Sequence, residues 1–533
     1  MKFAAGIAPA ALAVALAAPA WGQDSPDKWG GFLDLEAKPG TARHLGEADL
    51  FVPLAQDERN LLFANVKARL DDNDSKEGNF GAGVRHMHTS GWNLGAYGYF
   101  DRRITGNDNL FNQLTFGAEA LGEDFEFRVN SYWPIGKKVK FVDSLNTADL
   151  SGTSVTFRGG EEHALQGFDA EIGWRVPAFA AGGPLDIRLY AGGYTFDDDT
   201  VDAVTGPRLR AELIAYEMPG LWEGARVTLG AEWQTDEPRG SQGFLSARLR
   251  IPLQPEKERS RKLTAQERRM TAPVVRDVDI VAQAGTFGAP ETATQTAGGT
   301  AFTVIDSAST AGNDLDAAVA AAGANSTVIL SGTFQVTGAN TVSLSNGQSL
   351  MAGAIGVRSA SGRPATLVTS ATIAGTNLSS TVQINSNGTL SGMTVSNAFS
   401  GGTGGRAVIV ADGAGNVTVI NNTLSVTQSG ANAAVALGIG QNTSATVRGN
   451  TLTVTGSGAA TTMTALGMNN PNTTVTVAGN TISASGGTTN YVAWMAAGTT
   501  LNPGSTGNVR GGGACNGTPA SGTIGFTNGT TCP

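Results

Sequence analysis

Two cysteines near the C-terminus are the residues of this chain most suited to covalent chemistry. Cys515 and Cys532 are the only cysteines among 533 residues. In an oxidising compartment, their closeness in sequence predicts a disulfide that closes a small terminal loop. Two unpaired thiols are the alternative, because spacing alone does not establish the bond.

Carboxylates that could act as general acid, general base or metal ligand are scarce in the C-terminal half. Reactions on polysaccharides need clustered carboxylates, for proton transfer or for calcium. After residue 280, only Asp412 lies well inside the repeated segments described below. An isolated carboxylate cannot supply such a pair, so we predict that this half is not an enzyme. A surface enzyme acting on polysaccharide is the alternative. The acidic residues are Glu291, Asp306, Asp314, Asp316 and Asp412.

Two histidines lie two residues apart on one predicted strand face. His86 and His88 therefore have a spacing that can bind a metal ion, but two ligands without a third are weak evidence for a site. His86 also continues the apolar register of Phe80 and Val84. We interpret both histidines as side chains at a membrane interface and predict no cofactor.

The composition changes at about Ile280. The histidines discussed above lie before this point, and the cysteines and acidic residues lie after it. Before this residue, short segments alternate apolar and charged residues, whereas residues 281–533 contain no Lys and no His. Two polypeptides this different cannot share one hydrophobic core, so we predict separate parts. The formal net charge of −9 argues against nucleic acid as a partner.

The N-terminus predicts export. Residues 1–22 contain Lys2, then the apolar run Ala4–Ala18, then small residues that permit cleavage after Ala20 or Gly22. This pattern is typical of a secretory signal peptide. No other apolar run approaches the roughly 20 residues of a membrane-spanning helix, so any membrane crossing must use strands.

The segment from residue 23 to 253 predicts such strands. In residues 61–70, Leu62, Val66 and Leu70 fall on one face, while Lys67 and Arg69 fall on the other. About twelve segments repeat this alternation, and an even number of strands of roughly ten residues is typical of an outer-membrane barrel. A soluble β-sandwich is the alternative. The segments lie near residues 31–37, 47–54, 60–70, 79–89, 92–102, 110–121, 124–134, 166–179, 184–197, 206–218, 224–236 and 241–253.

Aromatic residues near the segment ends predict girdles at the two membrane interfaces. The connections differ in length: residues 89–91 suit a short periplasmic turn, and residues 136–166 suit an external loop. The aromatic residues are Trp92, Tyr97, Tyr99, Phe100, Tyr132, Trp133, Trp174, Trp222 and Trp233.

Residues 291–533 contain a repeat. Segments 417–426, 445–454 and 475–484 place Asn422, Asn450 and Asn480 in one frame, and residues 382–390 form an earlier copy with one extra residue. Short β-branched strands separated by Gly and Asn predict a right-handed parallel β-helix in which these three asparagines stack as an amide ladder. A flexible Gly/Thr-rich stalk is the alternative. Residues 313–323 predict a short helix that caps the first rung, and the cysteine loop would cap the last.

The N-terminal half resembles a known family. About residues 29–280 are similar to the inverse autotransporter barrel of intimin and invasin. The resemblance implies a twelve-stranded barrel in the outer membrane and a C-terminal passenger that crosses the membrane through it. The segments that carry it are GEADLFVPL (Gly46–Leu54), NFGAGVRHM (Asn79–Met87), WNLGAYGYFD (Trp92–Asp101), FGAEALGEDFEFRVNSYWP (Phe116–Pro134), GFDAEIGW (Gly167–Trp174) and SARLRIPL (Ser246–Leu253).

The segment 254–290 joins the two parts and is basic. By the same resemblance, the end of its Lys/Arg-rich part, PVVRDVDIV (Pro273–Val281), passes through the pore. We predict that its arginines contact acidic side chains of the barrel lumen, whereas an exposed charged linker is the alternative. The predicted contact residues are Arg268, Arg269 and Arg276 on the segment and Glu119, Glu126, Glu171, Glu212 and Glu232 on the barrel.

These observations predict an all-β protein: a signal peptide (1–22), a transmembrane antiparallel barrel (23–253), a basic pore segment (254–290) and a β-helix passenger (291–533). The resemblance implies self-export and adhesion at the cell surface. The implied partners are outer-membrane lipids, the barrel assembly machinery, periplasmic chaperones and an unidentified surface receptor or matrix. A porin-like channel with an accessory domain is a further alternative, although a basic segment in the pore would plug it.

Overall fold

The structure is a computed structural model that describes residues 28–533, except 217, 219, 223, 254–262, 277–278, 401–403, 458 and 469–470. The predicted signal peptide, residues 1–22, lies outside the described residues. So does the first part of the basic segment, residues 254–262.

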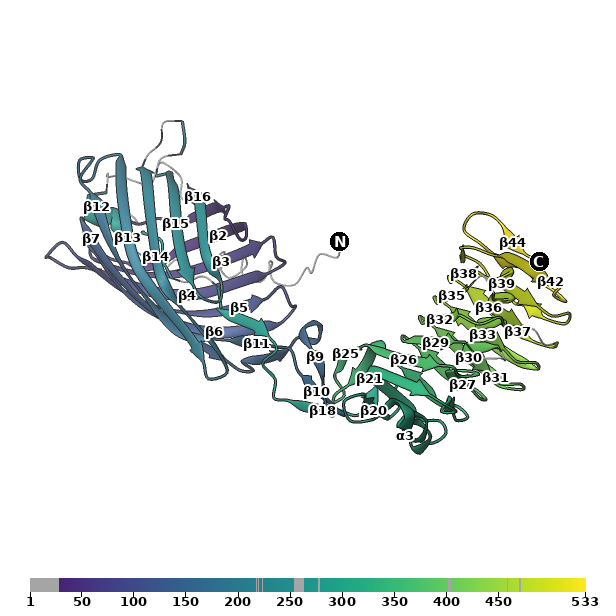
Figure 1. Cartoon of the computed structure of the whole chain (residues 1–533). Helices are drawn as coiled ribbons and strands as arrows, with labels where there is room; N and C mark the ends of the chain where they lie inside the picture. The colour runs from purple at the N-terminus through teal and green to yellow at the C-terminus, as the bar shows by residue number, and fades with distance from the viewer. Residues whose placement is uncertain are drawn as a thin grey trace. The chain divides into compact units, whose positions relative to one another are not determined.

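Twelve antiparallel strands close into a barrel, in the order β1-β16-β15-β14-β13-β12-β7-β6-β5-β4-β3-β2 (Figure 1). The prediction of a twelve-stranded barrel is therefore confirmed. The strands are β1 (Phe32–Lys38), β2 (Leu45–Gln56), β3 (Asn60–Asp71), β4 (Lys76–Met87), β5 (Asn93–Ile104), β6 (Leu110–Leu121), β7 (Phe125–Ile135), β12 (Gln166–Val176), β13 (Leu185–Asp198), β14 (Val201–Tyr216), β15 (Arg226–Asp236) and β16 (Gly240–Pro252).

The two faces of each strand differ as the alternation predicts. On β3, Lys67 and Arg69 are buried toward the lumen, whereas Leu62 and Leu70 are exposed on the outside. Leu245 on β16 is 65 % exposed. The outer surface is therefore apolar, as contact with lipid requires.

The interface-girdle interpretation was wrong for three aromatic residues. Tyr97, Tyr99 and Tyr132 are buried inside the barrel, because they occupy the inward register of their strands. Their hydroxyl groups find polar partners there: that of Tyr97 donates to Asn130 Oδ1 at 2.8 Å, and that of Tyr99 donates to Asn65 Oδ1 at 2.8 Å. The exposed aromatic residues include Phe100, Trp133, Trp174, Trp222 and Trp233.

We expect Leu245→Arg to impair barrel assembly, because it places a charge against lipid at the middle of β16. A charged side chain on the lipid face near the bilayer centre costs about 2–4 kcal/mol. The matched control is Ser246→Arg, which places the same charge on the neighbouring residue, facing the lumen. Heat-modifiable migration of the barrel on gels measures assembly. Equal loss in both variants would contradict this assignment of the two faces.

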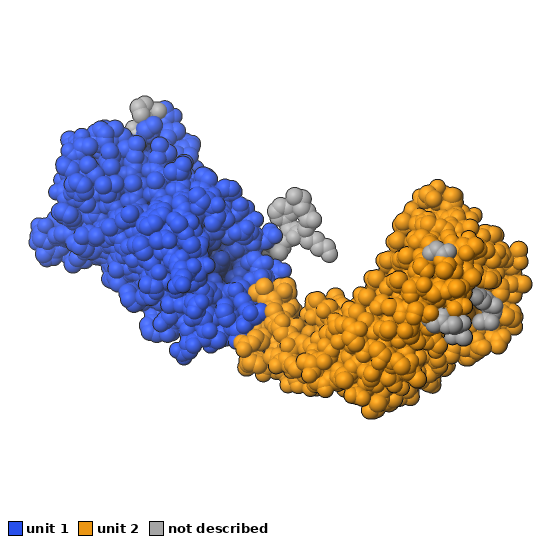
Figure 2. Space-filling model, in the orientation of Figure 1, with its two compact units in different colours: residues 1–142, 161–287 blue, residues 143–160, 288–533 orange. Residues whose placement is uncertain are grey.

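The chain divides into two compact units (Figure 2). The first contains residues 1–142 and 161–287, and the second contains residues 143–160 and 288–533. Residues 288–533 are called the passenger below. Residues 143–160 lie between barrel strands β7 and β12 in sequence, yet they belong to the unit of the passenger.

The connection between β7 and β12 forms four short strands. β8 (Val139–Phe141) and β11 (Glu161–Ala164) form a three-stranded sheet with β17 (Ala282–Gly285) in the first unit. In the second unit, β9 (Thr147–Ser151) and β10 (Ser154–Arg158) lie in a six-stranded sheet of order β18-β10-β9-β25-β24-β19. The other members are β18 (Glu291–Ala293), β19 (Gln295–Thr296), β24 (Gly353–Arg358) and β25 (Pro364–Thr369).

The rest of the passenger is a stack of rungs in which parallel strands form long ladders, as a β-helix requires. The first ladder is β21 (Thr327–Thr337), β23 (Ser349–Met351), β28 (Thr389–Ser391), β31 (Gly415–Ile420), β34 (Thr443–Arg448), β37 (Thr474–Ala478) and β40 (Thr500–Leu501). From β21 the second continues through β26 (Ala371–Thr376), β29 (Thr394–Phe399), β32 (Thr423–Gln428), β35 (Thr451–Gly456), β38 (Thr481–Ser485) and β41 (Val509–Arg510). The third is β22 (Val342–Leu344), β27 (Val382–Ile384), β30 (Gly405–Val410), β33 (Ala434–Ile439), β36 (Thr462–Met468), β39 (Thr489–Met495) and β42 (Ala514–Gly517).

Both ends of the stack carry elements that cover its core. At the first rungs, α3 (Leu315–Ala321) follows a 3-10 turn, η3 (Gly312–Asp314), and buries Leu315 and Val319 in the passenger core. Here β20 (Phe302–Asp306) pairs with β21. At the last rungs, β43 (Ile524–Gly525) and β44 (Thr531–Cys532) form a hairpin. Ile524, Phe526 and Cys532 belong to the same core.

The proposed earlier copy of the repeat, residues 382–390, was in the wrong frame. Val382 lies on the third ladder and pairs with Val408, whereas Leu390 lies on the first ladder and pairs with Val419. The two residues therefore belong to different faces of the β-helix. Thr389 pairs with Thr418, the second residue of the repeat segment 417–426.

Candidate functional site: the filled barrel lumen

The barrel lumen contains the chain itself, at residues 263–276 and 279–281, which we call the lumen segment. It begins with the short helix α2 (Ala265–Arg269), whose N-cap residue Thr264 forms a capping box with Glu267. The indole of Trp29 donates to the Glu267 carbonyl at 2.9 Å, and Lys28 lies 2.8 Å from the Glu267 carboxylate. The N-terminal end of the described chain thus holds the start of this segment.

After α2, side chains of the barrel wall donate to the backbone carbonyls of the lumen segment. Arg85 Nη1 reaches the carbonyls of Met270 and Ala272, both at 2.7 Å. Such donors take the role that a neighbouring strand would have in a sheet, because buried carbonyls need partners. Three further contacts are Arg250 to Thr271 at 2.8 Å, Lys67 to Val274 at 3.1 Å and Asn130 to Val275 at 3.2 Å.

Ion pairs fix the last part of the lumen segment. Arg276 Nη2 lies 2.9 Å from Asp101, with both side chains fully buried, and Asp279 contacts both Arg43 and Arg69. These pairs matter because a buried charge is stable only with an opposite charge nearby. Arg103 also donates to the Ile280 carbonyl at 2.6 Å, and the Ile280 N–H donates to Glu77 at 3.0 Å.

The order of these contacts shows that the lumen segment crosses the barrel from one end to the other. Near α2, Gln266 Nε2 donates to the His88 carbonyl, which lies in the short turn between β4 and β5. At the other end, Ile280 contacts Glu77 at the start of β4 and Arg103 at the end of β5. The chain then forms β17, which pairs with β11 of the long connection between β7 and β12.

The predicted contact residues of the segment have different surroundings. Arg269 pairs with Glu126, and Arg276 pairs with Asp101 rather than with a predicted glutamate. Arg268 donates to the carbonyls of Gly182 and Gly183. Arg269 and Arg276 therefore contact strands of the barrel wall, whereas Arg268 contacts the turn between β12 and β13. Only Arg269 contacts one of the predicted glutamates.

The other predicted glutamates pair with arginine or lysine residues of the barrel wall. Glu119 lies 2.6 Å from Arg85, Glu171 and Glu212 lie 2.8 and 2.9 Å from Arg210, and Glu232 lies 2.7 Å from Lys38. These pairs balance the charge of the wall. Arg85 links the two sets of contacts, because it binds both Glu119 and the lumen segment.

Sequence reasoning missed Asp101, Asp279 and Arg85. The register of β5 contains a usable signal, because Asp101 shares the inward face with Tyr97 and Tyr99. An apolar cluster in the lumen was also missed, since the predicted lumen was polar throughout. This cluster packs Met270 and Val274 of the lumen segment; its other buried members are Trp29, Phe32, Phe51, Leu61, Phe63, Tyr97 and Tyr99.

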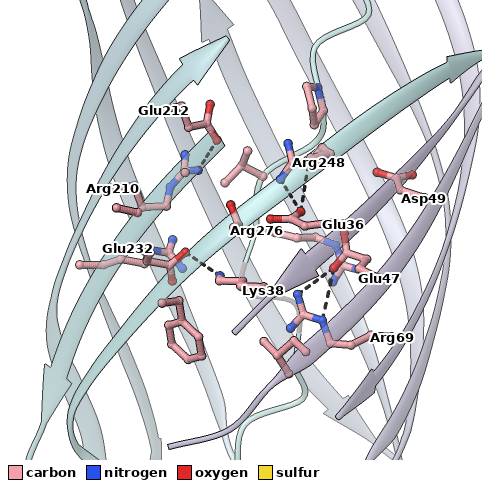
Figure 3. Close-up of a pocket in the computed structure, with 18 of the residues that line it drawn as sticks. Glu36, Lys38, Glu47, Asp49, Arg69, Arg210, Glu212, Glu232, Arg248 and Arg276 are labelled. Atoms are coloured by element: carbon pink, nitrogen blue, oxygen red, sulfur yellow. Dashed lines mark hydrogen bonds and ion pairs between the residues drawn. The ribbon is translucent and has the colours of Figure 1, made fainter. Parts of the chain in front are cut away.

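A polar cavity of about 90 Å³ remains between the lumen segment and one side of the wall (Figure 3). Pairs on its wall include Arg248 with Glu36, Arg69 with Glu47, and Lys38 with Glu232. Val274 and Arg276 border it from the lumen segment. The space has room for only a few water molecules.

The asparagine ladder of the passenger forms a chain of amide hydrogen bonds. Asn422 Nδ2 donates to Asn450 Oδ1 at 3.1 Å, and Asn450 Nδ2 donates to Asn480 Oδ1 at 3.0 Å. Asn480 continues the ladder to Asn508, which we had not predicted, at 3.0 Å. The residue before each of these asparagines has a positive φ; these residues are Asn421, Gly449, Gly479 and Gly507. A Gly-Asn pair at 507–508 is the sequence signal that would have identified the last member.

The two cysteines lie at the end of the passenger. Cys515 and Cys532 form a disulfide with a Cα–Cα separation of 5.4 Å. Cys515 lies on β42, the last strand of the third ladder, and Cys532 lies on β44 in the terminal hairpin. The bond therefore joins this hairpin to the last rung.

We expect Asn450→Ala to destabilise the passenger by about 2–4 kcal/mol, because it removes the acceptor of two buried donors. These donors are the N–H and the Nδ2 group of Asn422. Thr446→Ala is the control, because Thr446 is exposed on β34, the strand that precedes Asn450. Denaturant titration of the full-length protein, followed by protease protection of the passenger, measures the difference. Equal midpoints for the two variants would contradict a stabilising ladder.

Within the described ranges, no group of three or more His, Cys, Asp or Glu residues could hold a metal ion. His86 and His88 are exposed and hydrogen-bond to Asn60 and Ser90, respectively. None of the described helices is both long and apolar enough to cross a membrane.

A closed barrel with an apolar outer face and a lumen occupied by its own chain defines an outer-membrane β-barrel protein whose pore is plugged from within. Residues 33–201 match the family model of the inverse autotransporter β-domain, from β1 to the first residue of β14. The barrel of this protein is an inverse autotransporter β-domain and lies in the outer membrane.

Solved structures of other barrels are similar to this chain. A chain from work on the in-meso crystallization of membrane proteins is 17 % identical, with 48 % of this chain and 100 % of that chain covered and a TM-score of 0.35. An outer membrane channel from Pseudomonas putida F1 is 10 % identical, with 44 % and 99 % covered and a TM-score of 0.33. The KdgM porin is 6 % identical, with 41 % and 97 % covered and a TM-score of 0.25. No curated protein matches the chain.

Proposed function

We propose that the barrel anchors this protein in the outer membrane and exports its own passenger, which is displayed at the cell surface for adhesion. The path of the lumen segment is the observation that carries this proposal. The chain crosses the whole barrel between the last barrel strand and the first strand of the passenger. A passenger that had not travelled through the pore would have no need of this path.

The wall contacts give the segment a second role as a plug. A pore left open after export would leak small solutes, and the ion pairs of Arg269, Arg276 and Asp279 oppose this by holding the segment in place. The turn that contains His88 would then face the periplasm, and the connection between β7 and β12 would face outward. Assembly would use periplasmic chaperones and the barrel assembly machinery, as the family implies.

An adhesive role agrees with the chemistry of the passenger better than an enzymatic one does. Asp412, the acidic residue inside the repeats, accepts hydrogen bonds from the backbone N–H and side-chain amide of Gln441, at 3.0 and 3.2 Å. It therefore has a role in a turn between rungs. The stack instead presents an extended surface of Thr, Asn and Gly, on which a receptor or matrix could bind by repeated contacts.

Surface labelling tests export. A cysteine introduced at Ser457, which is exposed on a passenger rung, should react with a membrane-impermeant maleimide in intact cells. A cysteine at Ser90, in the turn beside His88, should react only after the outer membrane is permeabilised. The reverse pattern would place the passenger in the periplasm and reject the proposal. Binding of intact cells to matrix-coated surfaces, compared with cells that display only residues 1–287, tests adhesion.

A further inference from the structure

The connection between β7 and β12 supplies strands to residues that follow the lumen segment. Along the chain, β17 comes first after the lumen segment, and it pairs with β11 from Glu161↔Gly285 to Ala164↔Ala282. The next strand, β18, pairs with β10 from Val155↔Ala293 to Phe157↔Glu291. Both pairings are antiparallel. Two successive strands that follow the lumen segment therefore each pair with a strand of the connection between β7 and β12.

The hairpin β9–β10 also completes the core at the base of the passenger. It lies in the middle of the six-stranded sheet, where β10 pairs with β18 and β9 pairs with β25. Its residues Ala148, Val155 and Phe157 are buried in one cluster with passenger residues. The passenger members are Ala293, Val304, Ile329, Ile355, Val357 and Leu367. Without the hairpin, β18 and β25 would be open edges above an uncovered apolar cluster.

A polar contact fixes the base of the hairpin. Arg363, in the turn between β24 and β25, donates to Asn146 Oδ1 at 2.7 Å and to the Gly160 carbonyl at 2.8 Å. It also lies 3.1 Å from Asp143. One passenger side chain thus contacts both ends of residues 143–160. In return, Asn146 Nδ2 donates to the Pro364 carbonyl at 2.7 Å.

Ordering the first rung has the largest free-energy cost in forming a β-helix. Each rung is stabilised mainly by its neighbours, so the first must be ordered without one. Parallel pairing adds to this cost, because loops must close before distant strands meet. A preformed strand pair with apolar side chains removes part of the cost. Its position in the barrel sequence lets it fold before the passenger arrives.

We propose that residues 143–160 are an intramolecular template on which the exported passenger begins to fold. The strand β18 first pairs with β10. The first rungs then pack on the apolar face of the hairpin, and Arg363 hydrogen-bonds to Asn146 and Gly160. The proposal rests on the proposed export function, since the template acts on a chain that leaves the pore. Its partner is the segment from Gly288 to Thr369 of the same chain.

Pulse-chase expression of the full-length protein in Gram-negative cells tests the template. The measured quantities are labelling of the Ser457 cysteine, which reports export, and the time at which the passenger becomes protease-resistant, which reports folding. We expect Val155→Asp and Arg363→Ala each to slow the gain of resistance about tenfold or more, because charged hydrogen bonds and burial at a nucleus act on the folding rate. Labelling at Ser457 should be unchanged.

Matched controls change the same elements on their exposed faces. Ser154→Asp adds the same charge to an exposed position of β10 beside Val155, and Arg358→Ala removes an exposed arginine from β24. Both should fold at the original rate. If Val155→Asp prevents barrel assembly, as heat-modifiable migration would show, Arg363→Ala decides, because Arg363 is outside the barrel strands.

The unfolding rate of the mature passenger separates a template from an ordinary stabilising contact. A template predicts slow folding with unfolding changed less than about twofold. An unchanged folding rate with faster unfolding would overturn the proposal, since the hairpin would then only stabilise the finished passenger. Loss of Ser457 labelling in the unmodified protein would instead reject export itself.

Discussion

Val447→Asp is expected to abolish cooperative folding of the passenger around the rung that contains β34. Val447 is fully buried and pairs with Val419 on one side and Val477 on the other. An aspartate here would place a carboxylate between two branched apolar side chains with no charged partner nearby. We expect a loss of roughly 4 kcal/mol or more. Denaturant titration of the full-length protein, followed by protease protection of the passenger, measures it.

The matched control is Thr446→Asp, which adds the same charge one residue earlier on the same strand. Thr446 points outward and is exposed, so we expect a change below about 0.5 kcal/mol. Because each rung stabilises the next, protection should also fall in the neighbouring rungs of the first variant. Indistinguishable titrations for the two variants would show that the passenger is a flexible Gly/Thr-rich stalk.

Arg85→Leu is expected to loosen the plug and raise the conductance of the barrel. Arg85 and Glu119 have fully buried side chains 2.6 Å apart. Breaking such a pair costs about 3–5 kcal/mol, since it leaves a buried charge without its main partner. The change also removes the donors to Met270 and Ala272. Single-channel recording in planar bilayers should show frequent open events that the unmodified protein lacks.

Two further variants test whether the raised conductance comes from losing the contacts of Arg85 with the lumen segment. Arg102→Leu removes an exposed arginine from the outer face of β5 and should leave conductance unchanged. Arg85→Leu combined with Glu119→Leu should recover most of the lost stability, because no charge is left buried alone. It should still conduct, since the carbonyl donors are missing. A closed pore in both Arg85 variants would show that this residue does not hold the plug.

The sequence predicts the barrel well because its strands repeat one strong signal. Alternation of apolar and charged residues specifies both the strand and its two faces, and the confirmed lumen positions of Lys67 and Arg69 illustrate this. Aromatic residues are ambiguous under the same rule. Tyr97 and Tyr99 could belong to an interface or to the lumen, and only the register within β5 places them inside.

Contacts between distant parts of the chain were harder to predict. Asp101 and Arg276 are 175 residues apart, and composition gives no reason to join them rather than another pair. The hairpin β9–β10 is similar: its residues read as an external loop, because the strands that complete its sheet lie after residue 290. In the passenger, the frame shift at residues 382–390 arose because short β-branched strands occur on every face of a β-helix.

The elements that differ from the repeated rungs lie at the two ends of the second unit. The helix α3 and the hairpin β9–β10 occur at the first rungs, and the disulfide and hairpin β43–β44 occur at the last. The rungs between Asn422 and Asn508 are nearly interchangeable, because each presents a buried asparagine that follows a residue with a positive φ. Duplication of residues 451–480 in the gene would therefore add one layer of about 4.8 Å without disturbing either terminus. The length of the passenger can thus be adjusted in steps by recombination, independently of the barrel.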